Sequence, residues 1–179
     1  MKGIVFVGFF ELVEKEFGYE MVDKLIEACD LPSEGIYTSV GTYSHEEMVQ
    51  LLTRLSEFTG VSVPVLLKTY GKYFGKAHLR KYANFYEQAP DIFTFLESVH
   101  DHIHVEVKKL YPDAELPHFA SKRLSDKQLQ LTYTSSRKMG AFAEGLIEDS
   151  ALYYGETVDI EKELLAEDGS KILFTISRK

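Results

Sequence analysis

Two groups of residues combine side-chain types and spacings that are suited to binding a ligand. The first is a trio of histidines spaced by two residues: His100, His102 and His104. Imidazole is a common metal ligand, so this trio suggests a metal site. The second group alternates along the chain and offers two hydroxyls and a guanidinium, which suit carboxylates: Tyr133, Ser135 and Arg137. Whether either group converges depends on the elements that carry it.

The histidines lie in a stretch whose apolar residues recur at steps of three and four, as in a helix: Ile92, Leu96, Val99, Ile103, Val107 and Leu110. We therefore expect one helix, capped by Asp91, through the histidines. In such a helix His102 lies on the side opposite to His100 and His104, so the three cannot bind one ion. A zinc pair of His100 and His104 stays geometrically open, but it lacks the glutamate of H-E-x-x-H and a third ligand.

The other elements are predicted in the same way. Helices are expected over 3–17 and 19–29, after Ser44 in a capping box with Glu47, and after Ser62. From 129 to 137 the period changes to two, which indicates a strand that projects Tyr133, Ser135 and Arg137 to one face. A helix at 141–154 and a hairpin around the DG of EDGS follow. The fold class is α+β: helices first, then a small antiparallel sheet of about four strands with an inserted helix.

Composition restricts the function classes. With 179 residues, one domain over 1–179 is expected. A net charge of -8 argues against nucleic acid as a partner. A single cysteine, Cys29, forms neither an internal disulfide nor a cysteine-rich zinc site. No signal-peptide pattern or membrane-span stretch is present, so we expect no membrane association and a cytoplasmic protein.

The stretches HVEVKKLYPDAELPHF and YTSSR, with the opening MKGIVF, resemble the heme nitric oxide/oxygen binding (H-NOX) family over essentially the whole chain. The resemblance implies heme b with His104 as the axial ligand, followed thirteen residues later by Pro117. Taking His100 instead would make that separation seventeen. Tyr133, Ser135 and Arg137 would hold the heme propionates. It also implies a helical subdomain at about 1–60, a remainder at about 61–179, and heme buried between the helical part and the sheet.

The same resemblance assigns residues to the gas-binding side of the heme pocket. These residues are Val5, Phe9, Phe74, Phe142 and Leu146. In oxygen-binding members a distal tyrosine donates a hydrogen bond to O₂, and Phe142 stands at that position here. Because NO binds ferrous heme without such a donor, an apolar pocket implies selectivity for NO. Tyr70 and Tyr73 lie nearby in sequence, and a hydroxyl turned inward would alter this expectation.

The implied function is a non-enzymatic sensor that takes NO or CO as gas ligand. NO would weaken the iron bond to His104, so that the helix moves and a heme held distorted partly by Pro117 relaxes. The implied partners are a histidine kinase, as in bacterial two-component signalling, or a cyclic di-GMP enzyme (diguanylate cyclase or phosphodiesterase). No zinc is expected, because the cysteine cluster of some relatives is missing.

Two alternatives stay open at this point. One is an oxygen or redox sensor built on the same heme, and the other is a zinc hydrolase that uses His100 and His104. The remaining histidines are expected to be ordinary capped or solvent-exposed residues: His45, His78, His102 and His118.

Overall fold

The first part of the chain is a group of helices joined by short turns. The computed structural model describes all residues from Met1 to Lys179. Four helices come first: α1 (Gly3–Phe17), α2 (Tyr19–Ala28), α3 (His45–Thr59) and α4 (Val63–Ala77). Gly18 separates α1 from α2 and Gly60 ends α3, both with positive φ that glycine adopts without a steric penalty. The predictions for 3–17 and 19–29 are confirmed to within one residue.

The start of α3 differs from the predicted capping box. Ser44 is the N-cap, and its hydroxyl accepts from the backbone N–H of Glu46 at 3.2 Å. Glu47 does not reach back to Ser44. Its buried carboxylate instead accepts from the hydroxyls of Ser33 and Tyr37, so it secures the α2–α3 loop.

The histidine stretch is not the single continuous helix that the periodicity predicts. Short segments η1 (Leu79–Lys81) and α5 (Ala83–Glu87) lead to α6 (Ile92–Ser98), and Asp91 caps α6 by accepting from the N–H of Thr94 at 2.8 Å. The chain then passes through a π-helical turn, η2 (Val99–Ile103), into α7 (His104–Leu110). A π-turn inserts an extra residue, so α6 and α7 do not share one α-helical phase.

The second part is a four-stranded antiparallel sheet in the order β1-β2-β4-β3. Its strands are β1 (His118–Ser125), β2 (Gln128–Thr134), β3 (Val158–Leu164) and β4 (Lys171–Arg178), and helix α8 (Gly140–Tyr153) lies between β2 and β3 in the chain. The hairpin around the DG turn joins β3 to β4 as predicted. The α+β class, with helices first and a helix inserted in the sheet, is confirmed.

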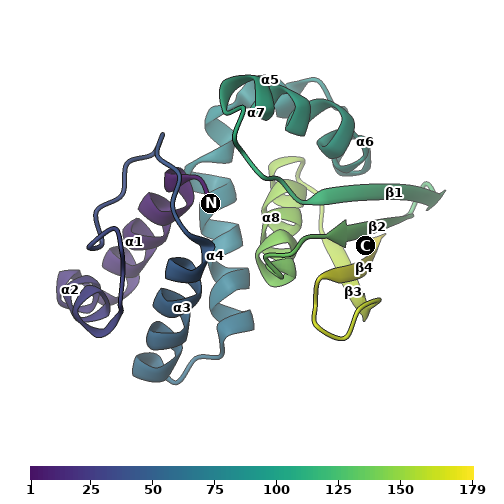
Figure 1. Cartoon of the computed structure of the whole chain (residues 1–179). Helices are drawn as coiled ribbons and strands as arrows, with labels where there is room; N and C mark the ends of the chain where they lie inside the picture. The colour runs from purple at the N-terminus through teal and green to yellow at the C-terminus, as the bar shows by residue number, and fades with distance from the viewer.

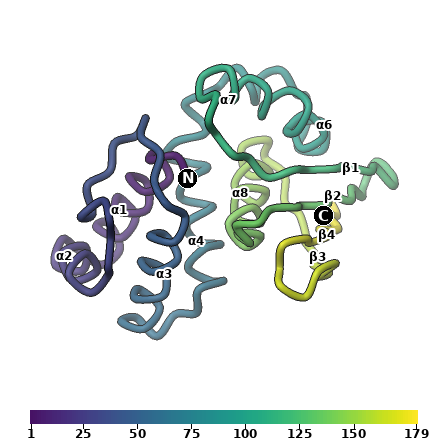
Figure 2. The backbone as a smooth tube through the Cα atoms, in the orientation of Figure 1, coloured from purple at the N-terminus to yellow at the C-terminus, as the bar shows by residue number.

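Two hydrophobic cores form, and α4 and α8 meet between them (Figure 1). The first core lies among α1, α3 and α4, and the second lies between α8, α6 and the sheet. The two helices approach closely because Gly71 and Gly145 face each other: a Cβ on Gly145 would lie 2.1 Å from the backbone oxygen of Lys68. The tube in Figure 2 shows α5 to α7 running over one end of this pair before the chain enters β1. None of the helices has the length and apolarity needed to cross a membrane.

Candidate functional site

A large apolar cavity of about 320 Å³ lies where the two parts of the molecule meet. Its wall includes residues of α1, α4, α6, α7, β1, β2 and α8, and 25 of its 33 lining residues are hydrophobic. Few polar groups are present to bind a small hydrophilic molecule. The cavity is therefore suited to a bulky, mostly apolar ligand.

Of the three histidines spaced by two residues, His104 is the one that lines this cavity. It is the first residue of α7, directly after the π-turn, and its ring lies 5.8 Å from that of Phe119 between centroids. Burial, and after it the neighbouring His100, lower its pKa to about 4. The backbone of Pro117 opposes this shift, but Nδ1 is buried and has no hydrogen-bond partner of ordinary geometry. A neutral imidazole without a protein partner is chemically suited to bind a metal.

The other histidines do not complete a protein metal site. The ring of His100 lies 6.2 Å from that of His104 and 4.1 Å from that of His118. His102 is exposed and meets the Gln88 side chain at 2.9 Å. No group of three or more His, Cys, Asp or Glu side chains is placed to hold a metal ion. The geometry gives the zinc-hydrolase alternative no third ligand.

The Tyr133, Ser135 and Arg137 trio lines the cavity, but not as one face of a strand. Strand β2 ends at Thr134, and Ser135 begins a turn in which its hydroxyl accepts from the N–H of Arg137 at 3.2 Å. Tyr133 is buried, and its hydroxyl accepts from the N–H of Met139 at 3.0 Å. The prediction of a strand through 137 is wrong because the chain turns here toward α8. The turn still directs all three side chains to the cavity.

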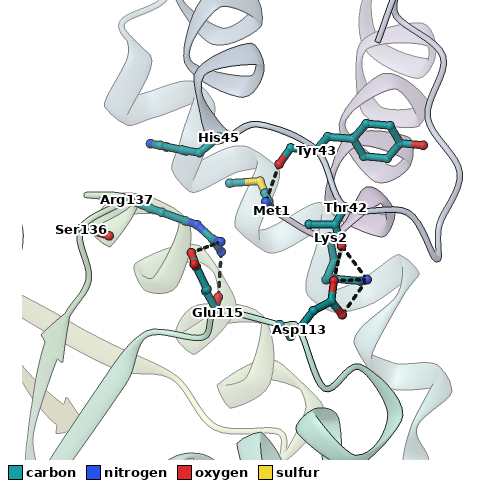
Figure 3. A pocket seen from close by; sticks show the side chains of 10 residues that line it. Met1, Lys2, Thr42, Tyr43, His45, Asp113, Glu115, Ser136 and Arg137 are labelled. Carbon is teal, nitrogen blue, oxygen red and sulfur yellow. Dashed lines mark hydrogen bonds and ion pairs between the residues drawn. The ribbon is translucent and has the colours of Figure 1, made fainter. Parts of the chain in front are cut away.

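A second, polar hollow of about 350 Å³ adjoins the cavity and shares Lys2, Glu115 and Arg137 with it (Figure 3). Here the Arg137 guanidinium donates to the backbone oxygen of Glu115 at 2.7 Å and to its exposed carboxylate at 2.9 Å. Burial lowers the pKa of His45 and of the Met1 ammonium, and the charge of Arg137 lowers both pKa values further. The Arg137 guanidinium thus brings a positive charge to the mouth of the cavity, where it pairs with the Glu115 carboxylate.

The predicted gas-side residues mostly form one wall. Val5, Phe74, Phe142 and Leu146 line the cavity, with the rings of Phe74 and Phe142 5.6 Å apart. Phe9 does not line it. Its buried ring packs edge-on against Tyr70 at 5.6 Å, behind the wall.

Neither of the tyrosines that were open to question lines the cavity. The fully buried hydroxyl of Tyr70 donates to the backbone carbonyl of Val5. Tyr73 is also absent from the cavity lining, and the ammonium of Lys15 lies 5.5 Å from its ring centre. The wall therefore receives no tyrosine hydroxyl from α4.

Several cavity residues were missed by sequence reasoning. His78 was expected to be capped or solvent-exposed, which is wrong: it is buried and lines the cavity. A set of aromatic residues from α5, α6 and the preceding turn also lines it: Tyr82, Phe85, Tyr86 and Phe95. The density of aromatics in YANFYE and FTFL is the sequence feature that would have indicated them.

These residues fit heme. The interior is apolar enough for a porphyrin, His104 offers a neutral nitrogen that no protein group occupies, and Arg137 stands at the mouth for the propionates. The fold and site together define a heme-binding protein.

Comparisons with known proteins agree. A family model described as Haem-NO-binding matches residues 2–162. The Fe(II) unliganded H-NOX protein from K. algicida is 43% identical, with a TM-score of 0.96, over 100% of this chain and 97% of that chain. The IWP-051-bound H-NOX from Shewanella woodyi, in the Fe(II)CO ligation state, is 43% identical with a TM-score of 0.83. The match covers 100% of this chain and 95% of that chain. An H-NOX protein from S. oneidensis in the Fe(II)NO state shares the fold at 23% identity, with a TM-score of 0.90. The match covers 100% of this chain and 99% of that chain. No protein of curated function matches.

The chain belongs to the haem-NO-binding, or H-NOX, family of heme-based gas-sensor domains. The family resemblance drawn from HVEVKKLYPDAELPHF and YTSSR is thereby confirmed, together with heme as the family's cofactor.

Proposed function

We propose that this chain is a nitric oxide sensor that uses heme b and has no catalytic activity of its own. The observation that carries the proposal is the gas-side wall. Phe142 and Phe74 face the cavity, and the hydroxyl of the nearby Tyr70 is bonded to the Val5 carbonyl. A wall without a tyrosine donor disfavours O₂ binding, because bound O₂ needs a hydrogen bond to its partly negative oxygen. NO binding needs no such donor and is not weakened.

His104 holds the iron in this proposal, and the polar mouth orients the group. Arg137 is the residue that pairs with the propionates, with Ser135 and Tyr133 beside it. In the structure described here the carboxylate of Glu115 is bonded to Arg137. Because Glu115 is exposed, it is able to turn to solvent when a propionate takes its place.

Bound heme would supply ferrous iron able to take up NO, which would loosen the hold of His104 on that iron. The protein's part is to turn that loosening into movement. His104 begins α7 immediately after a π-turn, an arrangement with fewer regular helical hydrogen bonds than a continuous α-helix. We infer that α7 and the loop to Pro117 shift together when the histidine is released.

The partner in this proposal is a histidine kinase or a diguanylate cyclase/phosphodiesterase in the cytoplasm. The partner class follows from the resemblance of HVEVKKLYPDAELPHF and YTSSR to stand-alone H-NOX gas sensors, and the 43% identical H-NOX from Shewanella woodyi supports only the gas ligand, through its Fe(II)CO state. A conformational change read by a second protein is what a sensor without catalytic residues requires.

The absorption spectrum of the purified ferrous protein, with and without NO, CO and O₂, tests the proposal. We expect a Soret band that shifts with NO and CO and is unchanged in air-saturated buffer. A stable O₂ adduct would overturn the selectivity for NO. Bound zinc with no Soret band would instead support the hydrolase alternative.

A further inference from the structure

A buried histidine lies beside the gas-side wall and is not used by the proposed mechanism. His78 follows the last residue of α4, is 7% exposed and lines the cavity. Its ring stacks on Phe74, with centroids 4.9 Å apart and planes 27° apart. It is therefore a polar group held against one of the aromatic rings that face the gas.

The ring has a fixed partner on α1. Its Nε2 lies 2.9 Å from Oε2 of Glu11, whereas Nδ1 forms no hydrogen bond. Gly8, one turn before Glu11, makes the approach possible, because a Cβ there would lie 2.9 Å from Nε2. The missing side chain at position 8 thus leaves room for the His78 ring against α1.

The contact with Glu11 determines which ring nitrogen carries the hydrogen. A carboxylate is an acceptor, so Nε2 must donate to it. In a neutral imidazole the other nitrogen, Nδ1, then has a lone pair and no hydrogen. The neutral ring that stacks on Phe74 therefore has an acceptor, and no donor, at Nδ1.

We propose that the Glu11–His78 pair determines gas specificity by denying the cavity a hydrogen-bond donor at Nδ1. This proposal rests on the proposed selectivity for NO and adds a second cause to the aromatic wall. Bound O₂ carries partial negative charge and is repelled by a lone pair, whereas NO binds ferrous heme without a donor. Glu11 is a positioning residue here, because it acts only through His78.

The experiment compares Glu11→Gln and His78→Leu with the parent protein at about pH 8. A glutamine amide is able to donate to Nε2, which allows the proton to move to Nδ1. Glu16→Gln is the matched control, since Glu16 is also on α1 and pairs only with Lys15. Glu11 is half exposed, so its substitution is expected to leave the fold intact.

Two measurements read the pair directly. Nitrogen-15 NMR of the ring in the CO-bound protein should show an unprotonated Nδ1 in the parent and Glu16→Gln, and a protonated fraction in Glu11→Gln. The C–O stretching frequency, which falls when a donor is near the bound gas, should drop in Glu11→Gln only. O₂ affinity should rise about tenfold there, the effect of one hydrogen bond. Adding His78→Leu to Glu11→Gln should cancel the drop in C–O frequency and the rise in O₂ affinity.

A protonated Nδ1 in the parent protein, or a C–O frequency that is the same in the parent and Glu11→Gln, overturns the proposal. These outcomes are distinct from a failure of the proposed function. A ferrous protein that does not bind NO refutes the sensor whatever the state of His78. A protein that binds NO and CO normally, with variants that leave the C–O frequency unmoved, refutes only the role of the pair.

Discussion

At the scale of single residues, Nδ1 of His104 is buried without a hydrogen-bond partner of ordinary geometry and the ring lines the cavity, so the imidazole is available to a metal. We predict that His104→Gly abolishes heme retention and that added imidazole restores it, because the small ligand occupies the space that the side chain leaves. The Soret absorbance of the protein after gel filtration, with and without imidazole, measures this.

His100→Ala and His102→Ala are the controls for that prediction. His100 packs against His118, and His102 is bonded to Gln88, so neither is needed at the iron. Both variants should keep the Soret band. If His100→Ala alone lost heme, the assignment of the axial ligand to His104 would be wrong.

Individual residues also show where sequence reasoning succeeds and where it stops. The family resemblance, which rests on the spacing of His104 to Pro117 and to YTSSR, assigned five residues to one site. All five line the same cavity: His104, Pro117, Tyr133, Ser135 and Arg137. The burial of His78 was not predictable in this way, because it depends on the missing side chain of Gly8, seventy positions away in sequence. Contacts of that kind exist only after the helices have packed.

At the scale of elements, α6 depends on its N-cap, and this helix positions the π-turn before His104. The Asp91 carboxylate accepts from the N–H of Thr94 and pairs with Arg178 at 3.0 Å. Burial by itself raises the pKa of Asp91, but the hydrogen bonds from Thr94 and the charge of Arg178 outweigh it and lower the pKa. The ionised form is therefore the one that stabilises the fold.

We predict that Asp91→Ala lowers the free energy of unfolding by about 1–2 kcal/mol at neutral pH, the usual effect of losing an N-cap. Because the folded-state pKa is below the ordinary value near 4, this contribution is present above that value and is lost as pH falls through the folded-state pKa. Urea unfolding at neutral and acid pH should thus show a difference between the two proteins that shrinks on acidification.

Asp23→Ala is the matched control, because Asp23 is an exposed aspartate on α2 without an ion pair. It should change the free energy of unfolding by less than about 0.5 kcal/mol. A difference for Asp91→Ala that stays constant with pH would contradict the role given to its charge.

The limits of sequence periodicity are clearest in the elements around the site. Apolar spacing predicted α1, α2 and α8 well, because apolar side chains recur at helical spacing along each of them. The π-turn at Val99–Ile103 was not predictable, since the apolar steps of three and four continue through it. In β2, alternation continues to Arg137, but the strand ends at Thr134 where the chain must turn into α8.

At the scale of the whole molecule, the two parts are joined in two physically different ways. The contact of α4 with α8 is backbone on backbone at Gly71 and Gly145, which leaves little freedom to slide. The loop after α7 is joined to the N-terminal part through polar side chains. Asp113 accepts from Thr42 at 2.6 Å, and both oxygens lie 3.3 Å from the ammonium of Lys2 (Figure 3).

This polar contact connects the segment that follows the axial histidine to the first residues of the chain. Lys2 and Thr42 also form a backbone bridge, and Tyr43 donates its N–H to the Met1 carbonyl at 2.9 Å. Asp113 is more than half exposed, so solvent screens its ion pair and the pair contributes little to global stability. Its effect is therefore expected on the local coupling between the two parts.

We predict that Asp113→Ala speeds amide hydrogen exchange at the bridge of Lys2 and Thr42 by up to about fivefold, which corresponds to the loss of one such pair. Exchange in α4 and α8 should stay unchanged, because their backbone contact does not involve Asp113. Glu106→Gln is the matched control, since it removes an exposed ion pair to Lys109 that lies within α7 and joins no other element. Equal exchange at the bridge in the two variants would show that Asp113 does not couple α7 to the N-terminal part, and movement would then have to pass through the cavity wall alone.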